Sequence, residues 1–151
     1  MTTITYMLYL AVVSFLSFLG GRFFSRSKIN PDRFPFATFA WEKNGRFYDS
    51  MGIRQWHNKL PDMSRILPFA MPSKKVPAGA TVEQLDNMVR ETCIAEVVHW
   101  FLVPAGLPGL IIWPSGINTF LWLLNSVCNL PFVAAQRYNR PRLQRLRQRL
   151  S

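Results

Sequence analysis

Glu91, Glu96 and His99 lie where the sequence enters an apolar stretch, and together they could perform acid–base chemistry. On a helix, steps of four and three residues place Thr92, Glu96 and His99 on one face. Glu91 lies about 80° around from His99 and could border the same site. Histidine titrates near neutral pH, which suits removal of a proton from a hydroxyl group. We therefore predict that His99 is a general base, with Glu96 orienting its ring and Glu91 assisting.

Two other interpretations of this helix stay open. Glu96 and His99 could serve only as hydrogen-bonding groups between neighbouring helices. A Glu and a His at this spacing could also share a metal ion, but His57 is the one further histidine, so we expect no metal site. Cys93 and Cys128 lack the paired spacing of a zinc or redox motif, and we expect them to be small buried residues and not nucleophiles.

Polar residues on either side of the apolar stretch are candidates for substrate binding. In the segment before it, His57 and Lys59 could bind an anionic or phosphate-bearing group, and Trp56 could anchor the loop. Asn129 and Gln136 belong to the apolar stretch itself, where such residues commonly form hydrogen bonds between helices. The candidate substrate-binding residues are Trp56, His57, Lys59, Gln136, Arg137, Asn139 and Arg140.

Two stretches without charged side chains, residues 4–21 and 97–136, must position these groups. A membrane-spanning helix needs roughly 20 apolar residues, so the first stretch predicts one crossing and the second predicts two. The turn composition of Trp113-Pro114-Ser115-Gly116 divides the second stretch into a helical hairpin, with segments 97–113 and 117–136. No basic residue precedes the first stretch, which favours an uncleaved anchor over a secretory signal.

The distribution of charge predicts the orientation of these spans. Residues 22–96 carry twelve basic and eight acidic side chains, and residues 137–151 carry six arginines and no acid. Because Lys and Arg gather on the cytoplasmic side, both segments should lie inside the cell and the N-terminus outside. We expect an all-α, multi-pass protein of the bacterial cytoplasmic membrane, divided into an N-terminal anchor (1–24), a cytosolic or interfacial segment (25–80), a helix entering the membrane with a C-terminal transmembrane hairpin (81–136) and a basic cytosolic tail (137–151).

The formal net charge of +10 is high enough to raise the possibility of nucleic-acid binding. The arginines, however, follow directly after an apolar stretch, and that position is typical of a flank that lies on anionic lipid. We therefore expect membrane lipids, and no nucleic acid, as partners. The oligomeric state stays open.

Turn residues predict the structure between the first and second spans. Residues 25–40 are rich in proline and aromatic residues and should not form a long regular helix. Over residues 41–50, Asn44-Gly45 could turn a short β-hairpin. Residues 50–59 should form a short helix or turn, and residues 71–80 a basic connector.

The helix that carries His99 has a clear predicted start and an ambiguous end. Thr81 and Gln84 have capping-box spacing and predict a helix that continues to about Leu102. Pro104 and Pro108 then interrupt the apolar stretch. Prolines at membrane depth are typical of broken helices, so this segment either crosses the membrane or dips in and returns.

Three motifs extend over most of the chain, from about Trp56 to Leu143. They are Trp56-x-x-Lys59-Leu60-Pro61-Asp62, then Arg90-Glu91-Thr92-Cys93-x-Ala95-Glu96-x-x-His99-Trp100, and then Asn129-Leu130-Pro131 with Gln136-Arg137-Tyr138-Asn139-Arg140-Pro141-Arg142-Leu143. In this order they resemble the glycosyl-4,4'-diaponeurosporenoate acyltransferase family, which is associated with the acylating step of staphyloxanthin-type carotenoid synthesis. His57 is not part of the pattern. The resemblance implies transfer of a fatty acyl group to a hydroxyl of a membrane-bound glycolipid.

The resemblance further implies two substrates and no cofactor. The acceptor would be a carotenoid glycoside or another sugar lipid, and the donor an acyl thioester of coenzyme A or of acyl carrier protein. The donor's phosphates, or the acidic surface of the carrier protein, could be held by Arg137, Arg140 and Lys59. The rival hypothesis is a non-enzymatic protein that binds a lipid or assembles with a membrane biosynthetic complex, in which case His99 would serve only to join helices.

Overall fold

A computed structural model of the chain describes residues 2–61 and 76–150, which form helices and turns without a strand. Three helical segments are long and apolar enough to cross a membrane: Thr2–Phe23, Val82–Ile112 and Gly116–Leu150. This confirms the predicted all-α membrane protein with three candidate spans. The chain divides into two compact units, which we call unit 1 (Met1–Ser25 and Ile94–Ala134) and unit 2 (Arg26–Cys93 and Ala135–Ser151).

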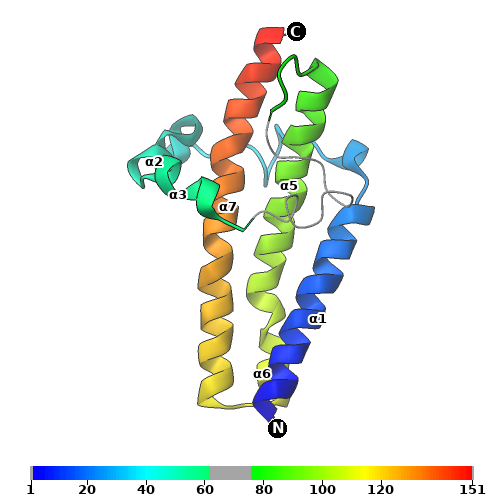
Figure 1. The fold of residues 1–151 in the computed structure, drawn as a ribbon, viewed down its shortest axis with the longest axis vertical. Helices are drawn as coiled ribbons and strands as arrows, with labels where there is room; N and C mark the ends of the chain where they lie inside the picture. Colours follow the sequence, from blue (N-terminus) through cyan, green and yellow to red (C-terminus); the bar gives the residue numbers. More distant parts are fainter. Residues whose placement is uncertain (1, 62–75, 151) are drawn as a thin grey trace. The chain divides into compact units, whose positions relative to one another are not determined.

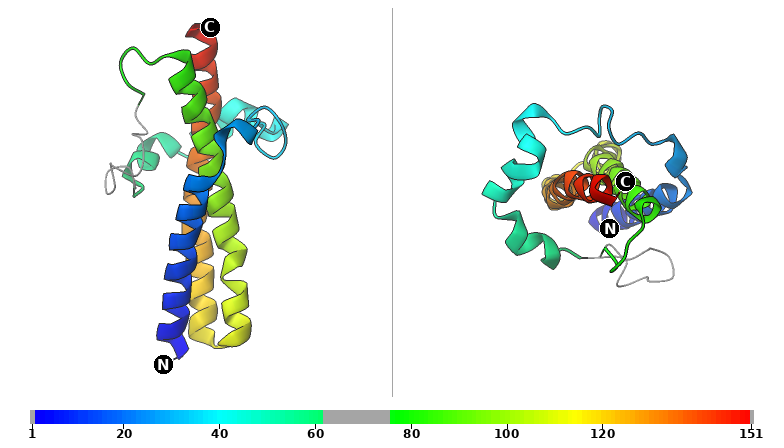
Figure 2. Two further views of the ribbon diagram at one scale, coloured as in Figure 1. Left: turned by 90° about the vertical axis from the view of Figure 1, so that its right-hand side faces the viewer. Right: turned by 90° about the horizontal axis from the view of Figure 1, so that it is seen from above.

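Unit 1 is a bundle of helical segments that lie side by side (Figures 1 and 2). It consists of α1 (Thr2–Phe23), the C-terminal part of α5 (Val82–Ala105), α6 (Leu107–Ile112) and the N-terminal part of α7 (Gly116–Leu150). Lipid tails are as apolar as leucine, so a bundle within a membrane can expose large apolar side chains. Those exposed on this unit include Ile4, Leu8, Phe15, Leu16, Ile111, Ile112, Phe120 and Val127.

The predicted turn between the last two spans is confirmed. α6 ends at Ile112 and α7 begins at Gly116, and Ser115 caps the new helix by accepting a hydrogen bond from the Asn118 backbone N–H at 3.1 Å. The Asn118 side chain donates to the carbonyl oxygen of Trp113 at 2.7 Å. These two bonds hold the turn within the hairpin, while the buried Oδ1 atom of Asn118 has no hydrogen-bond partner among the described residues.

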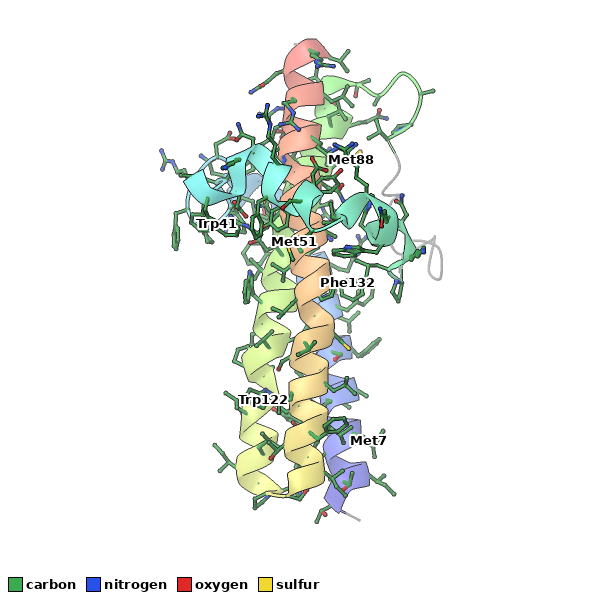
Figure 3. All side chains as sticks on the ribbon, turned by 90° about the vertical axis from the view of Figure 1, so that its left-hand side faces the viewer. Met7, Trp41, Met51, Met88, Trp122 and Phe132 are labelled. Carbon is green, nitrogen blue, oxygen red and sulfur yellow. The ribbon has the colours of Figure 1, made fainter. Side chains whose placement is uncertain are left out.

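The predicted interruption near the prolines is also confirmed, because α5 ends at Ala105 and α6 starts at Leu107. The last carbonyl groups of a helix have no partner inside it, and lipid offers none. Here side chains of the bundle donate to three of those oxygens: Asn125 to Leu102 at 3.1 Å, Trp122 to Val103 at 2.9 Å and Tyr9 to Ala105 at 2.6 Å. Tyr6 donates at 3.2 Å to the oxygen of Gly106, which follows α5 and also accepts from the Leu110 backbone N–H. Figure 3 labels Trp122 on α7. The broken helix is thus held by α1 and α7.

Two glycines of this break allow a close approach of α1 and α7. A Cβ atom added at Gly106 would lie 2.6 Å from the Trp122 ring, and one at Gly109 would lie 2.8 Å from the rings of Tyr6 and Tyr9. Real Cβ atoms do not approach other atoms so closely. The aromatic donors that satisfy the freed carbonyls therefore depend on the absence of side chains at these positions.

Unit 2 is organised by a segment that we call the collar, residues 26–61. It contains η1 (Arg26–Lys28), η2 (Ala40–Gly45), α2 (Arg46–Ser50), α3 (Ile53–Trp56) and η3 (His57–Lys59). Seen along the helices, the collar curves around the parts of α5 and α7 that belong to this unit (Figure 2). The predicted short helix over residues 50–59 is confirmed by α3 and η3.

The predicted β-hairpin over residues 41–50 is wrong. Lys43, Asn44 and Gly45 all have positive φ, at 48°, 55° and 91°, and they turn the chain from η2 directly into α2. An Asn-Gly pair tolerates this left-handed conformation equally well in a hairpin turn and in a turn between helices.

The start of α5 follows the predicted capping box. The Gln84 backbone N–H donates to the Thr81 hydroxyl oxygen at 3.2 Å, and the Gln84 side-chain oxygen accepts from the Thr81 backbone N–H at 3.0 Å. Of the predicted basic connector, residues 71–75 lie outside the described residues. At the other end of the chain, α7 continues as one helix through the basic tail to Leu150.

Candidate functional site

His99 of unit 1 lies on α5 and is held by two side chains of α7. Its Nδ1 atom lies 2.8 Å from Oδ1 of Asn129. The ring of Phe132, labelled in Figure 3, stacks on the imidazole with centroids 4.6 Å apart and an interplanar angle of 12°. The stacking fixes the plane of the histidine ring, and the hydrogen bond fixes its rotation within that plane.

The hydrogen bonds of Asn129 also determine which histidine nitrogen carries the proton. The amide nitrogen of Asn129 donates to the carbonyl oxygen of Asn125 at 2.8 Å, which leaves the amide oxygen facing His99. An amide oxygen only accepts, so in this arrangement Nδ1 donates the hydrogen bond, and Nε2 is the nitrogen without a proton whenever the ring is neutral. The lone pair then lies on Nε2, as a general base requires. The sequence predicted Asn129 as an interhelical hydrogen-bonding residue but did not identify His99 as its partner.

Glu96 lies one helical turn before His99, also in unit 1, and only 3% of its surface is exposed. A buried carboxylate is costly unless other groups compensate its charge. In a candidate span, such a residue is a functional-site hypothesis by default. The structure therefore places two of the three predicted catalytic residues on consecutive turns of α5.

In unit 2, Arg137 of α7 forms a buried ion pair with Glu42 of the collar. Nε and Nη2 of Arg137 donate to the two carboxylate oxygens of Glu42, the second at 2.9 Å. The same guanidinium donates to the carbonyl oxygens of Pro35 at 3.1 Å and Ala37 at 3.2 Å. Arg137 thereby fastens three points of the collar to α7.

The surroundings of Glu42 favour its ionised form. Burial alone would raise the pKa of this carboxyl group, but hydrogen bonds from Arg137, Tyr48 and the Phe39 backbone outweigh burial and lower the pKa below its ordinary value. Tyr48 donates its hydroxyl proton to Glu42, and burial together with this bond raises the pKa of the phenol. Glu42 is fully buried and was not singled out in the sequence.

Arg140, one turn after Arg137 on α7, also connects this helix to other parts of unit 2. It donates to the Thr92 hydroxyl oxygen at 3.0 Å and to the carbonyl oxygen of Phe36 at 2.6 Å. Glu91, the third predicted catalytic residue, accepts hydrogen bonds from Arg26 of the collar. In unit 2 these residues therefore join the collar to the helices.

The other predicted binding residues lie at separate places in unit 2. Nε1 of Trp56 donates to the carbonyl oxygen of Met51 at 3.3 Å, and the His57 ring lies 5.5 Å from that of Tyr138. Figure 3 labels Met51 on the collar. The remaining three have different exposures: Lys59 is exposed, Gln136 is buried and Asn139 is half-buried.

A pocket of about 340 Å³ in unit 2 was not foreseen from the sequence. Four arginines line it, namely Arg46, Arg54, Arg142 and Arg145. Two of them belong to the collar and two to α7, so only the fold brings them together. Within the described part of the chain, no group of three or more His, Cys, Asp and Glu side chains could hold a metal ion.

Comparisons with known proteins agree with the resemblance in the sequence. The profile of the glycosyl-4,4'-diaponeurosporenoate acyltransferase family matches residues 31–149. A protein of that name from Staphylococcus aureus strain MRSA252 is 30% identical over 118 residues, which cover 74% of this chain and 67% of the relative. The protein of the same name from strain USA300 is 31% identical over 118 residues, with the same coverage. No solved structure matches the chain.

Proposed function

Since the chain belongs to the glycosyl-4,4'-diaponeurosporenoate acyltransferase family and is an acyltransferase, we propose that it moves a fatty acyl group from a thioester to a hydroxyl of a glycosylated carotenoid acid. The acceptor is taken from the printed names of the relatives. A hydroxyl attacks a thioester poorly unless its proton is removed as the new bond forms, so the reaction needs a positioned base.

The pairing of His99 with Asn129 is the observation that carries this proposal. With Nδ1 donating to Asn129, the Nε2 lone pair takes the proton of the acceptor hydroxyl while its oxygen attacks the thioester carbonyl. The carbon–sulfur bond breaks, and the departing thiolate receives the proton from the imidazolium. The products are an acyl ester and a free thiol.

Glu96 supports this step through its charge. A histidine that accepts a proton becomes a cation, and a carboxylate one helical turn away stabilises that cation. Thr92 and Glu91 precede it on the same helix, but their contacts with Arg140 and Arg26 suit a role in fastening the collar. We assign Glu91 a supporting role, and the same holds for Gln136 and Asn139.

The proposed orientation places unit 2 at the cytosolic face. Its collar and the end of α7 carry most of the basic residues, and the positive-inside rule assigns such segments to the cytoplasm. An acyl thioester is a cytosolic metabolite and would reach the protein from that side. The carotenoid glycoside would approach laterally through the lipid.

The test is a mass-spectrometric comparison of membrane lipids from cells that supply both substrates. The strains express, at matched protein levels, the wild type, His99→Ala, Glu96→Gln or the control Val97→Ala, whose side chain is exposed on the same helix. We expect the acylated glycoside with the wild type and with Val97→Ala, and a strong loss with His99→Ala. Equal product in all four strains would contradict the base, whereas no product in any strain would favour a non-enzymatic lipid-binding or assembly role.

A further inference from the structure

The arginine-lined pocket of unit 2 has a charge and a size that call for an anionic ligand. Its lining includes four arginines and a single acid, Asp49, which gives a formal excess of three positive charges. The volume of about 340 Å³ lies within the range of pockets that bind small molecules, roughly 300–1,000 Å³. A concave site of this charge suits a compact polyanion better than an extended acidic surface.

Three of the four pocket arginines, Arg54, Arg142 and Arg145, have contacts that orient them, and only Arg54 is paired with a carboxylate. Arg54 forms a two-point ion pair with Asp49, at 2.7 and 3.1 Å. Arg142 lies over the ring of Tyr138, 4.8 Å from its centroid, and Arg145 donates to the carbonyl oxygen of Asn44 at 3.3 Å. A guanidinium has five N–H donors, so these contacts orient the groups and leave donors for a ligand.

The unbalanced charge concentrates on three of the four arginines. Among the described residues, no carboxylate lies in direct ion-pair contact with Arg46, Arg142 or Arg145, although the charge of Arg142 acts on Asp49 at longer range, and all three arginine side chains are exposed. By contrast, Arg137 and Arg140 are nearly buried and are engaged by the collar. The pocket arginines, unlike Arg137 and Arg140, are therefore accessible to a soluble ligand.

We propose that this pocket binds the phosphate groups at the nucleotide end of a coenzyme A thioester. The proposal rests on the acyltransferase function proposed above and names its donor. Coenzyme A carries a pyrophosphate and a 3'-phosphate, and arginine binds phosphate oxygens in a planar, two-point manner. The same phosphate chemistry occurs in the headgroups of anionic lipids, which the experiment must separate from the soluble ligand.

The experiment measures binding of coenzyme A itself, by calorimetry, to the full chain in phosphatidylcholine nanodiscs. The test variant is Arg46→Gln with Arg142→Gln, and the matched control is Arg33→Gln with Arg149→Gln, which removes the same charge from exposed arginines outside the pocket. Charge-assisted hydrogen bonds contribute about 1.5–3 kcal/mol each, so losing even one weakens binding about tenfold or more. We expect that loss in the test variant only, and a smaller loss for wild type when 3'-dephospho-coenzyme A replaces coenzyme A.

Repeating the titration in nanodiscs that contain phosphatidylglycerol separates the two sources of phosphate. Suppose that coenzyme A binds equally well to the wild type, the test variant and the control variant, and that only the association with phosphatidylglycerol falls in the test variant. The pocket then binds lipid headgroups, and the proposal is overturned. Absence of coenzyme A binding to the wild type overturns it as well. Coenzyme A binding that depends on Arg46 and Arg142 supports the proposed binding site even if no acyl transfer occurs. The binding experiment can therefore succeed or fail independently of the proposed acyltransferase reaction.

Discussion

The two units use the same pair of helices, α5 and α7, but join them by different chemistry. In unit 1 the side chains that connect helices are neutral, such as Trp122 and Asn125, and they donate to backbone oxygens freed at the break in α5. In unit 2 the connections are made by arginines: Arg147 of α7 forms an ion pair with Asp86 of α5, and Arg137 of α7 forms one with Glu42 of the collar. The same helix can thus bind its neighbours through neutral hydrogen bonds along part of its length and through ion pairs along the rest.

The difference follows from the surroundings that each sequence segment predicts. Lipid provides no hydrogen-bonding partner, so backbone groups within a membrane must be satisfied by the protein, and charge there is expensive. At an aqueous face, arginine can bring a strongly hydrated loop onto a helix because one guanidinium satisfies several carbonyl oxygens. Unit 1, which we call the neutral region, and unit 2, which we call the ionic region, should therefore respond differently to substitution, pH and salt.

The largest effect on stability should come from Glu42→Gln. The substitution leaves the guanidinium of Arg137 buried without its counter-charge, and breaking a buried ion pair costs about 3–5 kcal/mol. Denaturant unfolding in mixed micelles measures this loss, with Glu83→Gln, an exposed acid, as the control. A change of less than about 1 kcal/mol in Glu42→Gln would show that the collar does not depend on this pair.

The same pair predicts how the ionic region responds to acid. The pKa of Glu42 is lower in the folded protein than its ordinary value of 4.5, so its stabilising contribution is complete above pH 4.5. That contribution is lost as the pH falls through the lowered pKa. The protection of collar amides from hydrogen exchange, taken relative to the intrinsic rate at each pH, should therefore fall below pH 4.5 in the wild type, and Glu42→Gln should already have low protection at neutral pH. An unchanged collar at acid pH would contradict the assignment.

In the neutral region, two substitutions of Asn129 show whether this residue orients the His99 ring or only packs against it. Asn129→Asp keeps an oxygen that can accept from Nδ1, whereas Asn129→Leu removes it and allows the wrong tautomer. We expect Asn129→Leu to lower kcat about 100-fold, within the range that general-base catalysis supplies, and Asn129→Asp to lose much less. Similar kcat values for the two variants would show that the bond does not orient the base.

The rings of Tyr6 and Tyr9 pack closely against Gly109, which makes the neutral region sensitive to an added side chain at this position. In Gly109→Ala the new methyl group would meet the rings of Tyr6 and Tyr9 at 2.8 Å, and overpacking of this kind costs about 1–3 kcal/mol. Gly20→Ala is the control, because nothing lies within 4 Å of a Cβ at that position of α1. Thermal unfolding in detergent should show destabilisation only for Gly109→Ala, and equal melting of both variants would contradict the packing.

The smallest effect is expected at Asp86, which pairs with Arg90 at 2.7 Å and also with Arg147. These side chains are partly exposed, so Asp86→Asn should cost about 1 kcal/mol or less. Raising the salt concentration should shrink this difference, because salt screens exposed pairs more than buried ones. A difference that stays constant in high salt would place Asp86 in a drier environment.

The helices were largely predictable because their signals are local. Uncharged stretches, the turn before Gly116 and the capping box of Thr81 and Gln84 each lie within a few residues of the structure they determine. The Asn44-Gly45 turn was misassigned as a hairpin because its backbone conformation serves several kinds of turn. Whether a strand or a helix comes after such a turn depends on packing against α7, which is far away in the sequence.

The site was predictable only in part, for the same reason. His99 and Glu96 are conspicuous because they interrupt apolar sequence, whereas Glu42 lies in a short polar segment, and its ion-pair partner Arg137 is 95 residues away. The arginine pocket likewise combines the collar with α7. Partners that are distant in the chain leave no periodic signal in the sequence. A hydrogen bond from Asn129 to another helix could therefore be predicted, but the residue that it binds, His99, could not.

The role of His99 as the general base is tested most directly by the rate of acyl transfer by His99→Ala in isolated membranes supplied with acyl donor and glycoside acceptor. Folded protein is matched to the wild type, and Val97→Ala serves as the control. We expect a loss of at least about 100-fold in the rate for His99→Ala and little change for the control. A His99→Ala rate within about threefold of the wild type would show that His99 is not the general base.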